Sequence, residues 1–233
     1  MKGKTLVWAT LFLPALAPAQ ESGGLTGQVD VYMVPKANLE IRTPPATSAD
    51  VGGDGYGAKA FVHVTDLIKA TAEYQSVSYD AGDADRSDLR LGAGLGNGAG
   101  SGVFAEYLSI ENGDGFAVYG RAAGNFGIPR LGLHGQAGYV QVEDDERAYG
   151  FEFSLGASYA ILDVLGGTLG AMLDYRLTNL EGQESNVEVK LRDVRLGARF
   201  LFGGASDVIP DAAEEGVAVE PVVEEAPAEA PAE

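Results

Sequence analysis

The chain contains no cysteine among its 233 residues, so disulfide bonds cannot contribute to its stability. It also lacks long apolar runs: beyond Ala19 no segment approaches the roughly 20 apolar residues that a membrane-spanning helix needs. Any membrane span must therefore consist of strands. Basic residues are few, 16 Lys and Arg against 34 Asp and Glu, and they form no cluster that could displace counterions from phosphates. We expect no nucleic-acid partner.

Residues 1–19 have the composition of a secretory signal peptide. Lys2 and Lys4 precede an apolar run at 6–16, and Ala17-Pro18-Ala19 is an A-x-A cleavage site. The run is too short for a membrane helix, and Pro14 interrupts it. We expect cleavage after Ala19, so that the mature chain begins at Gln20.

The other end of the chain, residues 204–233, is rich in Pro, Ala and Glu. It holds nine acidic residues and no basic one, without a regular apolar period. Such a segment cannot bury enough apolar surface to offset its ordering entropy. We predict a disordered acidic tail on the periplasmic side.

Residues 20–203 show the pattern of a transmembrane antiparallel β-barrel. Segments of about ten residues alternate between apolar and small or polar side chains, and Gly, Asp and Asn clusters separate them. In 149–161 the odd positions are large and apolar, apart from Ala157, whereas the even positions are small or polar. The predicted strands are 25–35, 55–65, 68–79, 87–95, 102–110, 115–126, 131–142, 148–161, 168–180 and 186–202.

This pattern predicts an all-β, up-and-down barrel of about ten strands with both ends in the periplasm, and eight strands remain possible. Periplasmic turns are expected at Asp66-Leu67, 96–102, 127–129 and 163–167, and 36–54 is expected to be the longest external loop. Ten tyrosines within or beside the strands suit membrane interfaces. The alternative is a soluble secreted barrel or sandwich, whose inward face would need more Val, Ile and Leu.

The last predicted strand changes register, because Val187, Val189 and Leu191 are odd whereas the apolar residues from Val194 on are even. A bulge near Arg192-Asp193 would restore a single outward face. The strand ends Arg195-Leu196-Gly197-Ala198-Arg199-Phe200-Leu201-Phe202. These eight residues look like the assembly signal of outer-membrane β-barrel proteins.

With the alternation and the leader, the chain resembles the small outer-membrane β-barrel family that includes OmpA-like and OmpX-like barrels. The resemblance covers about Leu25 to Phe202. It implies residence in the bacterial outer membrane, among its lipid and lipopolysaccharide, and a barrel-assembly machinery that reads Gly197, Phe200 and Phe202. The chain departs from the family pattern in that Gly203 to Glu233 follow the terminal aromatic residue.

The strand register predicts a charged barrel interior. A barrel of eight to ten strands is only slightly wider than its side chains, so these charges are expected to pair and plug the lumen. The leading hypothesis is a structural or interaction protein, and the alternative is a small porin that passes ions or small solutes. The predicted lumen residues are Asp30, Lys59, Lys69, Glu73, Arg90, Glu106, Arg121, Glu152, Asp174 and Arg176.

An enzyme acting on lipid or peptide is the least favoured class. A serine nucleophile needs a neighbouring base, and the chain has only His63 and His134, neither of them in a His-x-Ser arrangement. We expect no catalytic residue and no cofactor.

Two predicted external loops are acidic, one with Asp80, Asp83, Asp85 and Asp88, the other spanning 143–146. The Asp83-x-Asp85-x-Ser87 spacing lacks the Gly and Glu of a calcium loop. A solvated acidic rim is the favoured reading. A hypothesis with less support is that these carboxylates hold divalent cations that also bridge lipopolysaccharide.

Overall fold

The structure is a computed structural model that describes residues 26–45, 47–80, 85–96, 100–111, 113–125, 127–164 and 166–203. The expected leader at 1–19 and acidic tail at 204–233 lie outside these residues. Within the described part of the chain, no helix is long and apolar enough to cross a membrane.

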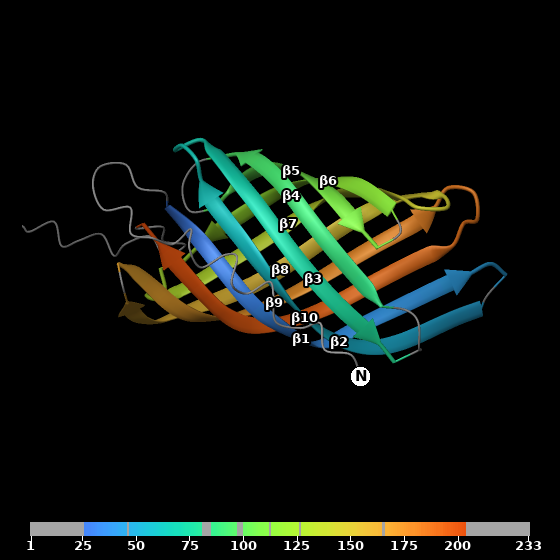
Figure 1. The fold of residues 1–233 in the computed structure, drawn as a ribbon, viewed down its shortest axis with the longest axis horizontal. Helices are drawn as coiled ribbons and strands as arrows, with labels where there is room; N and C mark the ends of the chain where they lie inside the picture. Colours follow the sequence, from blue (N-terminus) through green and yellow to red (C-terminus); the bar gives the residue numbers. More distant parts are fainter. Residues whose placement is uncertain are drawn as a thin grey trace, which may run out of the picture.

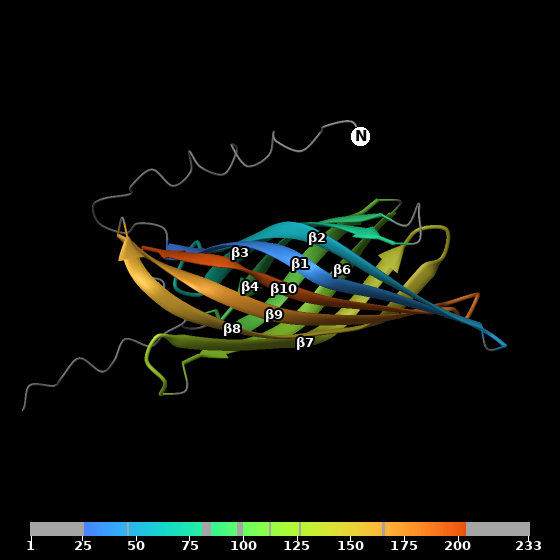
Figure 2. The same ribbon diagram turned by 90° about the horizontal axis from the view of Figure 1, so that it is seen from below.

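Ten antiparallel strands close into one barrel (Figure 1; Figure 2). Each strand pairs with its neighbours in sequence, and β1 pairs with β10 to complete the circle. The chain thus runs up and down without a crossover. The strands are β1 Thr26–Thr43, β2 Thr47–His63, β3 Ile68–Tyr79, β4 Arg86–Leu95, β5 Gly102–Ile110, β6 Gly113–Gly124, β7 Leu131–Glu143, β8 Arg147–Val164, β9 Gly167–Gly182 and β10 Glu188–Phe202.

The prediction of an all-β, ten-stranded, up-and-down barrel is confirmed. We call the end of the barrel that holds Thr26 and Phe202 the terminal end, and the opposite end the far end. The four turns predicted to be periplasmic all lie at the terminal end, between β2 and β3, β4 and β5, β6 and β7, and β8 and β9.

The prediction of a long loop at 36–54 is wrong. β1 continues to Thr43 and β2 begins at Thr47, so 36–54 forms a hairpin whose connection covers only 44–46. Both strands are paired across this region, from Ala37 opposite Gly53 to Thr43 opposite Thr47. Backbone pairing with β10 and β2 on either side holds the segment in the sheet despite its turn-like composition.

The predicted bulge in the last strand is also wrong. β10 pairs with β9 without interruption from Glu188 to Phe202. The irregularity lies in β1, where the register shifts between Met33 and Lys36 against β10. Here Pro35 and Lys36 are both exposed, as expected where an extra residue enters a strand. Proline has no N–H to donate to the ladder, which favours this position for the bulge.

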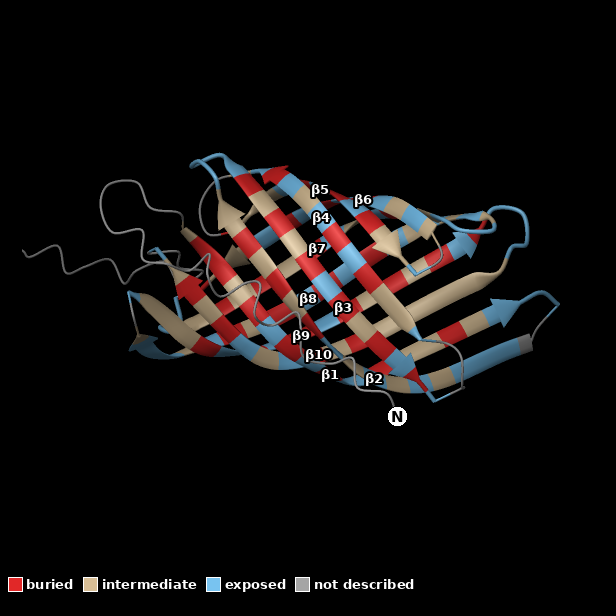
Figure 3. Cartoon of the chain, viewed as in Figure 1, coloured by how far each residue is buried: buried red, intermediate tan, exposed pale blue. Residues whose placement is uncertain are grey.

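Apolar side chains point outward around most of the barrel, and charged ones point inward. The exposed and buried residues alternate along each strand (Figure 3). On β8, Phe151, Phe153 and Leu155 are exposed, whereas Glu152 and Ser154 are buried. A soluble barrel would show the opposite arrangement.

The outward apolar belt has the height of a bilayer's hydrocarbon core. On β8 it runs between two exposed tyrosines, Tyr149 and Tyr159, which are ten positions apart. At about 3.3 Å per residue and a tilt of about 40°, ten residues rise roughly 25 Å along the barrel axis. This matches the apolar band of outer-membrane barrels, which is about 25 Å tall.

Tyrosine placement is only partly as expected. Seven of the ten are exposed, whereas Tyr32, Tyr79 and Tyr119 are buried inside the barrel. The buried rings need space that neighbouring strands provide with glycine. Tyr32 lies against Gly57 of β2, and Tyr119 lies against Gly138 of β7, where a Cβ atom would clash with it.

Candidate functional site

All ten residues predicted to face the lumen are buried. They belong to a larger set of eight cationic and seven carboxylate side chains on the inner face. The cations are Lys59, Lys69, Arg86, Arg90, Arg121, Arg176, Arg195 and Arg199, and the carboxylates are Asp30, Glu73, Asp88, Glu106, Glu152, Asp174 and Asp193.

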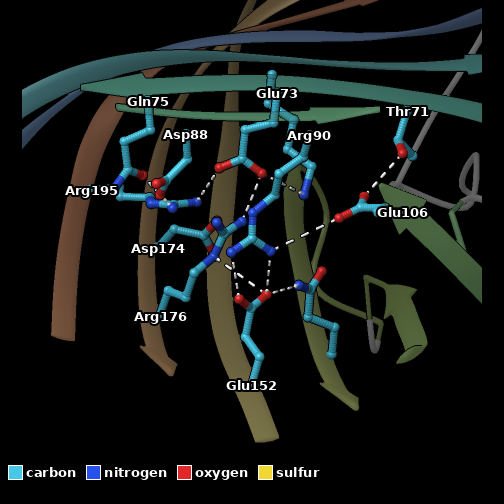
Figure 4. Close-up of polar contacts among 12 residues, drawn as sticks. Thr71, Glu73, Gln75, Asp88, Arg90, Glu106, Glu152, Asp174, Arg176 and Arg195 are labelled. Atoms are coloured by element: carbon cyan, nitrogen blue, oxygen red, sulfur yellow. Dashed lines mark hydrogen bonds and ion pairs between the residues drawn. The ribbon is translucent and has the colours of Figure 1, made fainter. Parts of the chain in front are cut away.

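Glu73 of β3 is the centre of the network (Figure 4). Its carboxylate lies 2.7 Å from Nη2 of Arg176 on β9 and 2.9 Å from Nη1 of Arg195 on β10. Lys59 on β2 is 3.6 Å away, and Tyr32 donates a hydrogen bond of 2.9 Å to the same carboxylate. A single acid therefore ties together strands from opposite walls of the barrel.

Arg90 of β4 forms the second cross-lumen link. It donates two hydrogen bonds, of 3.0 Å and 2.7 Å, to the two carboxylate oxygens of Glu152 on β8. The planar guanidinium fits a carboxylate in this bidentate way, which fixes both partners in orientation. Gln136 and Thr178 also donate to Glu152, so its lone pairs are well satisfied.

Glu106 of β5 extends the network formed around Glu73 and Arg90. It accepts a hydrogen bond of 2.9 Å from Thr71 and one of 2.5 Å from Tyr119. Arg90 lies 3.9 Å from it (Figure 4). The middle of the lumen thus holds a layer of charged side chains that ion pairs and hydrogen bonds connect.

Toward the far end, the interior becomes apolar. One cluster of buried side chains includes Leu108, Val140 and Leu180, and another includes Val34 and Val77. Between them, Arg86 of β4 reaches across to Asp193 of β10 at 2.8 Å. These side chains lie in the lumen toward the far end.

The terminal half of the lumen holds two separate pairs. Arg199 makes a bidentate contact with Asp30, at 2.8 Å and 2.9 Å, and joins β10 to β1. His134 of β7 lies 2.9 Å from Asp174 of β9 through Nε2. The histidine is therefore bonded to a carboxylate.

Sequence reasoning missed five inward charges: Arg86, Asp88, Asp193, Arg195 and Arg199. Arg195 and Arg199 were read only as part of the assembly signal, although their odd numbering puts them opposite the outward Leu196 and Phe200. Asp193 was missed because a bulge was expected at Arg192-Asp193, which left the direction of its side chain undecided. Asp88 was placed in an external loop, but it lies in β4, is buried, and is paired with Arg86 at 3.0 Å.

The proposed assembly residues lie at the end of β10, next to β1 and β9. Phe200 and Phe202 stack with their ring centroids 6.4 Å apart. Gly197 lies opposite Tyr32 of β1, and a Cβ at this position would clash with the backbone of Val31 and Tyr32. Gly197 therefore has a packing role of its own.

Beyond the apolar belt, the faces of the sheet are inverted. On the far-end part of β1 and β10, Leu39, Val189 and Leu191 face inward, and charged residues face outward. Arg192 binds Glu40 at 2.7 Å on this outer surface. We call the segments 37–43, 47–53 and 188–193 the far-end extension. Its polar exterior and apolar interior are those of a water-exposed sheet.

Among the described residues, no group of three or more His, Cys, Asp or Glu is placed to hold a metal ion. Asp83 of the expected acidic loop lies outside them. One acidic loop residue has a different role: Glu146 accepts hydrogen bonds from the Ser185 hydroxyl and from the N–H groups of Glu184 and Ser185, at 3.0 Å and 3.1 Å. It thereby connects the β7–β8 turn with the β9–β10 loop.

We expect this loop contact to weaken in acid. The hydrogen bonds, chiefly that from Ser185, lower the pKa of Glu146 from its ordinary value of 4.5. A carboxyl with a lowered folded-state pKa stabilises the contact above its unfolded pKa, and this effect is lost as the pH falls through the folded value. Relative to its intrinsic rate at each pH, hydrogen exchange at Glu184 and Ser185 should therefore accelerate as the pH falls below 4.5. Glu146→Gln should accelerate it at neutral pH, whereas Glu143→Gln should not.

Closure, the outward apolar belt and the charged interior make this fold a transmembrane β-barrel, as the sequence resemblance implied. No family model and no curated protein matches the chain. Among solved structures, an outer-membrane channel from Pseudomonas putida F1 is similar at 15% identity, with 80% of this chain and 98% of that chain covered and a TM-score of 0.45.

Two further structures are similar at lower scores. The outer-membrane protein OprG from Pseudomonas aeruginosa is 10% identical, covers 77% of this chain and 98% of its own, and has a TM-score of 0.33. Neisserial surface protein A is 14% identical, with 78% of this chain and 100% of that chain covered and a TM-score of 0.33. Because these scores are low, the barrel's own geometry carries the functional argument.

Proposed function

We propose that this protein is an outer-membrane barrel with a closed lumen and a structural or interaction role at the cell envelope. The observation that carries the proposal is the set of buried ion pairs that join opposite walls. β4 is linked to β8 by Arg90 and Glu152, and β3 is linked to β9 and β10 through Glu73. These contacts cross the barrel interior, where a pore would have to pass.

The energetic cost of opening supports a closed state. Removing one partner from a buried ion pair costs about 3–5 kcal/mol, because the other charge is left without compensation. A solute path along the axis would require the Glu73 contacts, the Arg90–Glu152 contact and the Arg86–Asp193 contact to part together. The apolar side chains at the far end add a second barrier, since they exclude hydrated ions.

With a closed lumen, the surfaces left for function are the outer ones. The far-end extension is one of these, and the far-end connections within the described residues are short. Its exterior carries ion pairs, Arg192 with Glu40 and Lys190 with Glu188, and the hydrogen bond of Asn38 to Asp50. A mixed-charge sheet of this kind can bind a polar partner such as a lipopolysaccharide headgroup or another envelope protein.

The proposal also includes the orientation of the barrel in the outer membrane. In up-and-down barrels of even strand number, both termini lie in the periplasm, so the far-end extension would face the exterior. The partners would be outer-membrane lipid, lipopolysaccharide and the barrel-assembly machinery. We propose neither catalysis nor a cofactor.

Single-channel recording tests the closed lumen. Refolded protein spanning Gln20 to Glu233 should insert into planar lipid bilayers without producing conductance steps, because charge pairs block the lumen. Insertion is checked independently by protease protection in vesicles made from the same lipids. A matched variant, Arg90→Ala with Glu152→Ala, removes one cation and one carboxylate and so keeps the net charge of the lumen, and it should produce measurable steps.

Stable, ion-selective steps from the unaltered protein would contradict the closed lumen and favour the small porin. In that case, Glu106→Gln and Arg121→Gln should change the ratio of cation to anion permeability.

The assembly role of the β10 terminus predicts a defect in folding rate rather than in stability. Replacing Phe202 by Ser should slow assembly in cells several-fold while the refolded protein keeps its unfolding midpoint, because Phe202 lies at the lipid-facing end of the strand. Pulse-labelling with heat-modifiability on gels measures assembly. The matched control is Leu196→Ser on the same face of β10. An equal defect in both variants would indicate lost lipid contact rather than recognition of the terminus.

A further inference from the structure

The far-end part of β2 has a free edge. β2 pairs with β1 as far as Thr47, whereas it pairs with β3 only from Gly53 onward, opposite Tyr79. The β1–β2 hairpin therefore projects beyond the end of β3 (Figure 1). Among the described residues, no strand residue pairs with 48–51 on this side of β2. An unpaired strand edge is a template for another strand.

One hydrogen bond shows which backbone groups this edge offers. Asp80 donates its N–H to the carbonyl of Gly52 at 2.8 Å, so the backbone groups of Gly52 face the side of β3. Backbone groups alternate between the two edges of a strand, and those of Asp50 and Ser48 therefore face the same side as Gly52. The residues between them face β1. The edge thus presents the N–H and C=O groups of Ser48 and Asp50 to an incoming strand.

The side chains of this edge differ between its two faces. Ser48 and Asp50 are exposed on the polar outer surface of the far-end extension. Val51 lies on the inner face, where it packs against the apolar cluster that contains Val34 and Val77. A strand added here would therefore place a polar residue opposite Asp50 and apolar residues at the two positions next to it.

Asp50 also differs in charge pairing from the other carboxylates on the outer surface of the extension. Both glutamates of this surface, Glu40 and Glu188, lie within ion-pair distance of a cation. Within the part of the chain that the structure describes, Asp50 accepts a hydrogen bond from Asn38 and has no cation at ion-pair distance. A lysine or arginine directly opposite Asp50 on an added strand would supply the missing charge.

We propose that the free edge of β2 at 48–51 binds an extended segment of a partner protein by strand addition, with a lysine or arginine of that segment opposite Asp50. The added strand runs antiparallel to β2, because it continues the line of β3 beyond Asp80. Main-chain hydrogen bonds to Ser48 and Asp50 hold it, and apolar residues flank its basic residue. This site gives the class of partner for the interaction role proposed above and rests on that role, but it does not depend on a closed lumen.

Peptide binding to variants of Ser48 tests the strand addition. The probe is a short fluorescein-labelled synthetic peptide of alternating valine and lysine, and its binding to the mature chain in zwitterionic detergent micelles is followed by fluorescence anisotropy. Ser48→Pro removes an N–H that faces the open edge, so pairing with β1 is kept while binding weakens about tenfold. Ser48→Ala is the matched control: it keeps this N–H and the net charge, and it should bind as the unaltered protein does.

Peptide binding to variants of Asp50 tests the charge. Asp50→Asn should weaken binding about two- to fivefold, and it keeps every backbone group, so it tests the site even if Ser48→Pro fails to fold. Its control is Asp54→Asn, which removes the same charge from an exposed position of β2 where β3 already occupies the edge. This control should bind as the unaltered protein does.

Two results would overturn the proposal. Equal binding by all four variants would show only a general attraction between a basic peptide and an acidic protein. Dimers of the unaltered protein that Ser48→Pro dissociates, detected by sedimentation without peptide, would show that a second copy occupies the edge. Either result leaves the silent bilayer expected above unchanged, whereas conductance steps would contradict the closed lumen and not this site.

Discussion

Glu73→Gln should lower the free energy of unfolding by about 3–5 kcal/mol, the largest effect expected for any conservative change inside this barrel. The substitution keeps the shape of the side chain and removes its charge. Arg176, Arg195 and Lys59 then lose their shared counter-ion at 2.7, 2.9 and 3.6 Å. None of these cations can turn toward water, because all three are buried. Urea unfolding in lipid vesicles, followed by circular dichroism, measures the loss.

An exposed pair supplies the control for Glu73. Glu143 and Arg147 lie 3.3 Å apart, with side chains 57% and 50% exposed, so Glu143→Gln should change stability by less than about 1 kcal/mol. The double variant Glu73→Gln with Arg176→Met removes one of the stranded cations, and its loss should be smaller than the sum of the single losses. Strict additivity, or a loss of under about 1 kcal/mol in Glu73→Gln, would show that the lumen charges are solvated.

Leu155→Arg should cost about 2–4 kcal/mol in a lipid bilayer, because this position lies halfway between the two tyrosines that bound the belt on β8. Leu155 is 57% exposed, so the cost comes from contact with hydrocarbon and not from disturbed packing. If the barrel were soluble and secreted, the same change would place a charge in water and shift stability by about 0.5 kcal/mol or less.

Ser48→Arg is the matched control for Leu155. Ser48 is an exposed position on β2 in the far-end extension, beyond the belt, and an arginine there should have little effect on stability. The comparison is made by urea unfolding of both variants in the same vesicles. Equal effects of the two substitutions would remove the distinction between belt and extension, and with it the membrane assignment.

The strand pattern was predictable because period-two alternation follows directly from strand geometry. In 149–161 every second side chain except Ala157 is large, and these large residues line the outer face. The same parity identified ten buried lumen residues, from Asp30 to Arg176. The predicted orientation of side chains was wrong where the surroundings of a strand change from lipid to water. Val189 and Leu191 are apolar and inward because the extension is surrounded by water, and this mimics a change of register.

The bulge is a second feature that the residue pattern of one strand could not locate. The odd-to-even switch in the last strand was explained by an irregularity in β10, whereas the irregularity is in β1 at Val34 to Lys36. A pattern within one strand does not reveal which of two paired strands holds the extra residue. The acidic composition of 80–88 was similarly misleading for Asp88, which is buried in the barrel and paired with the half-buried Arg86.

The sequence by itself determined the fold class, a strand number of about ten, the face that meets lipid on most strands, and ten of the charged residues inside. These follow from local properties: side-chain polarity and a period of two. Only the tertiary structure decided which charges meet. Glu73 and Arg176 are 103 residues apart, and Arg86 and Asp193 are 107 apart. They pair because closure and stagger of the barrel bring distant strands face to face across a narrow lumen.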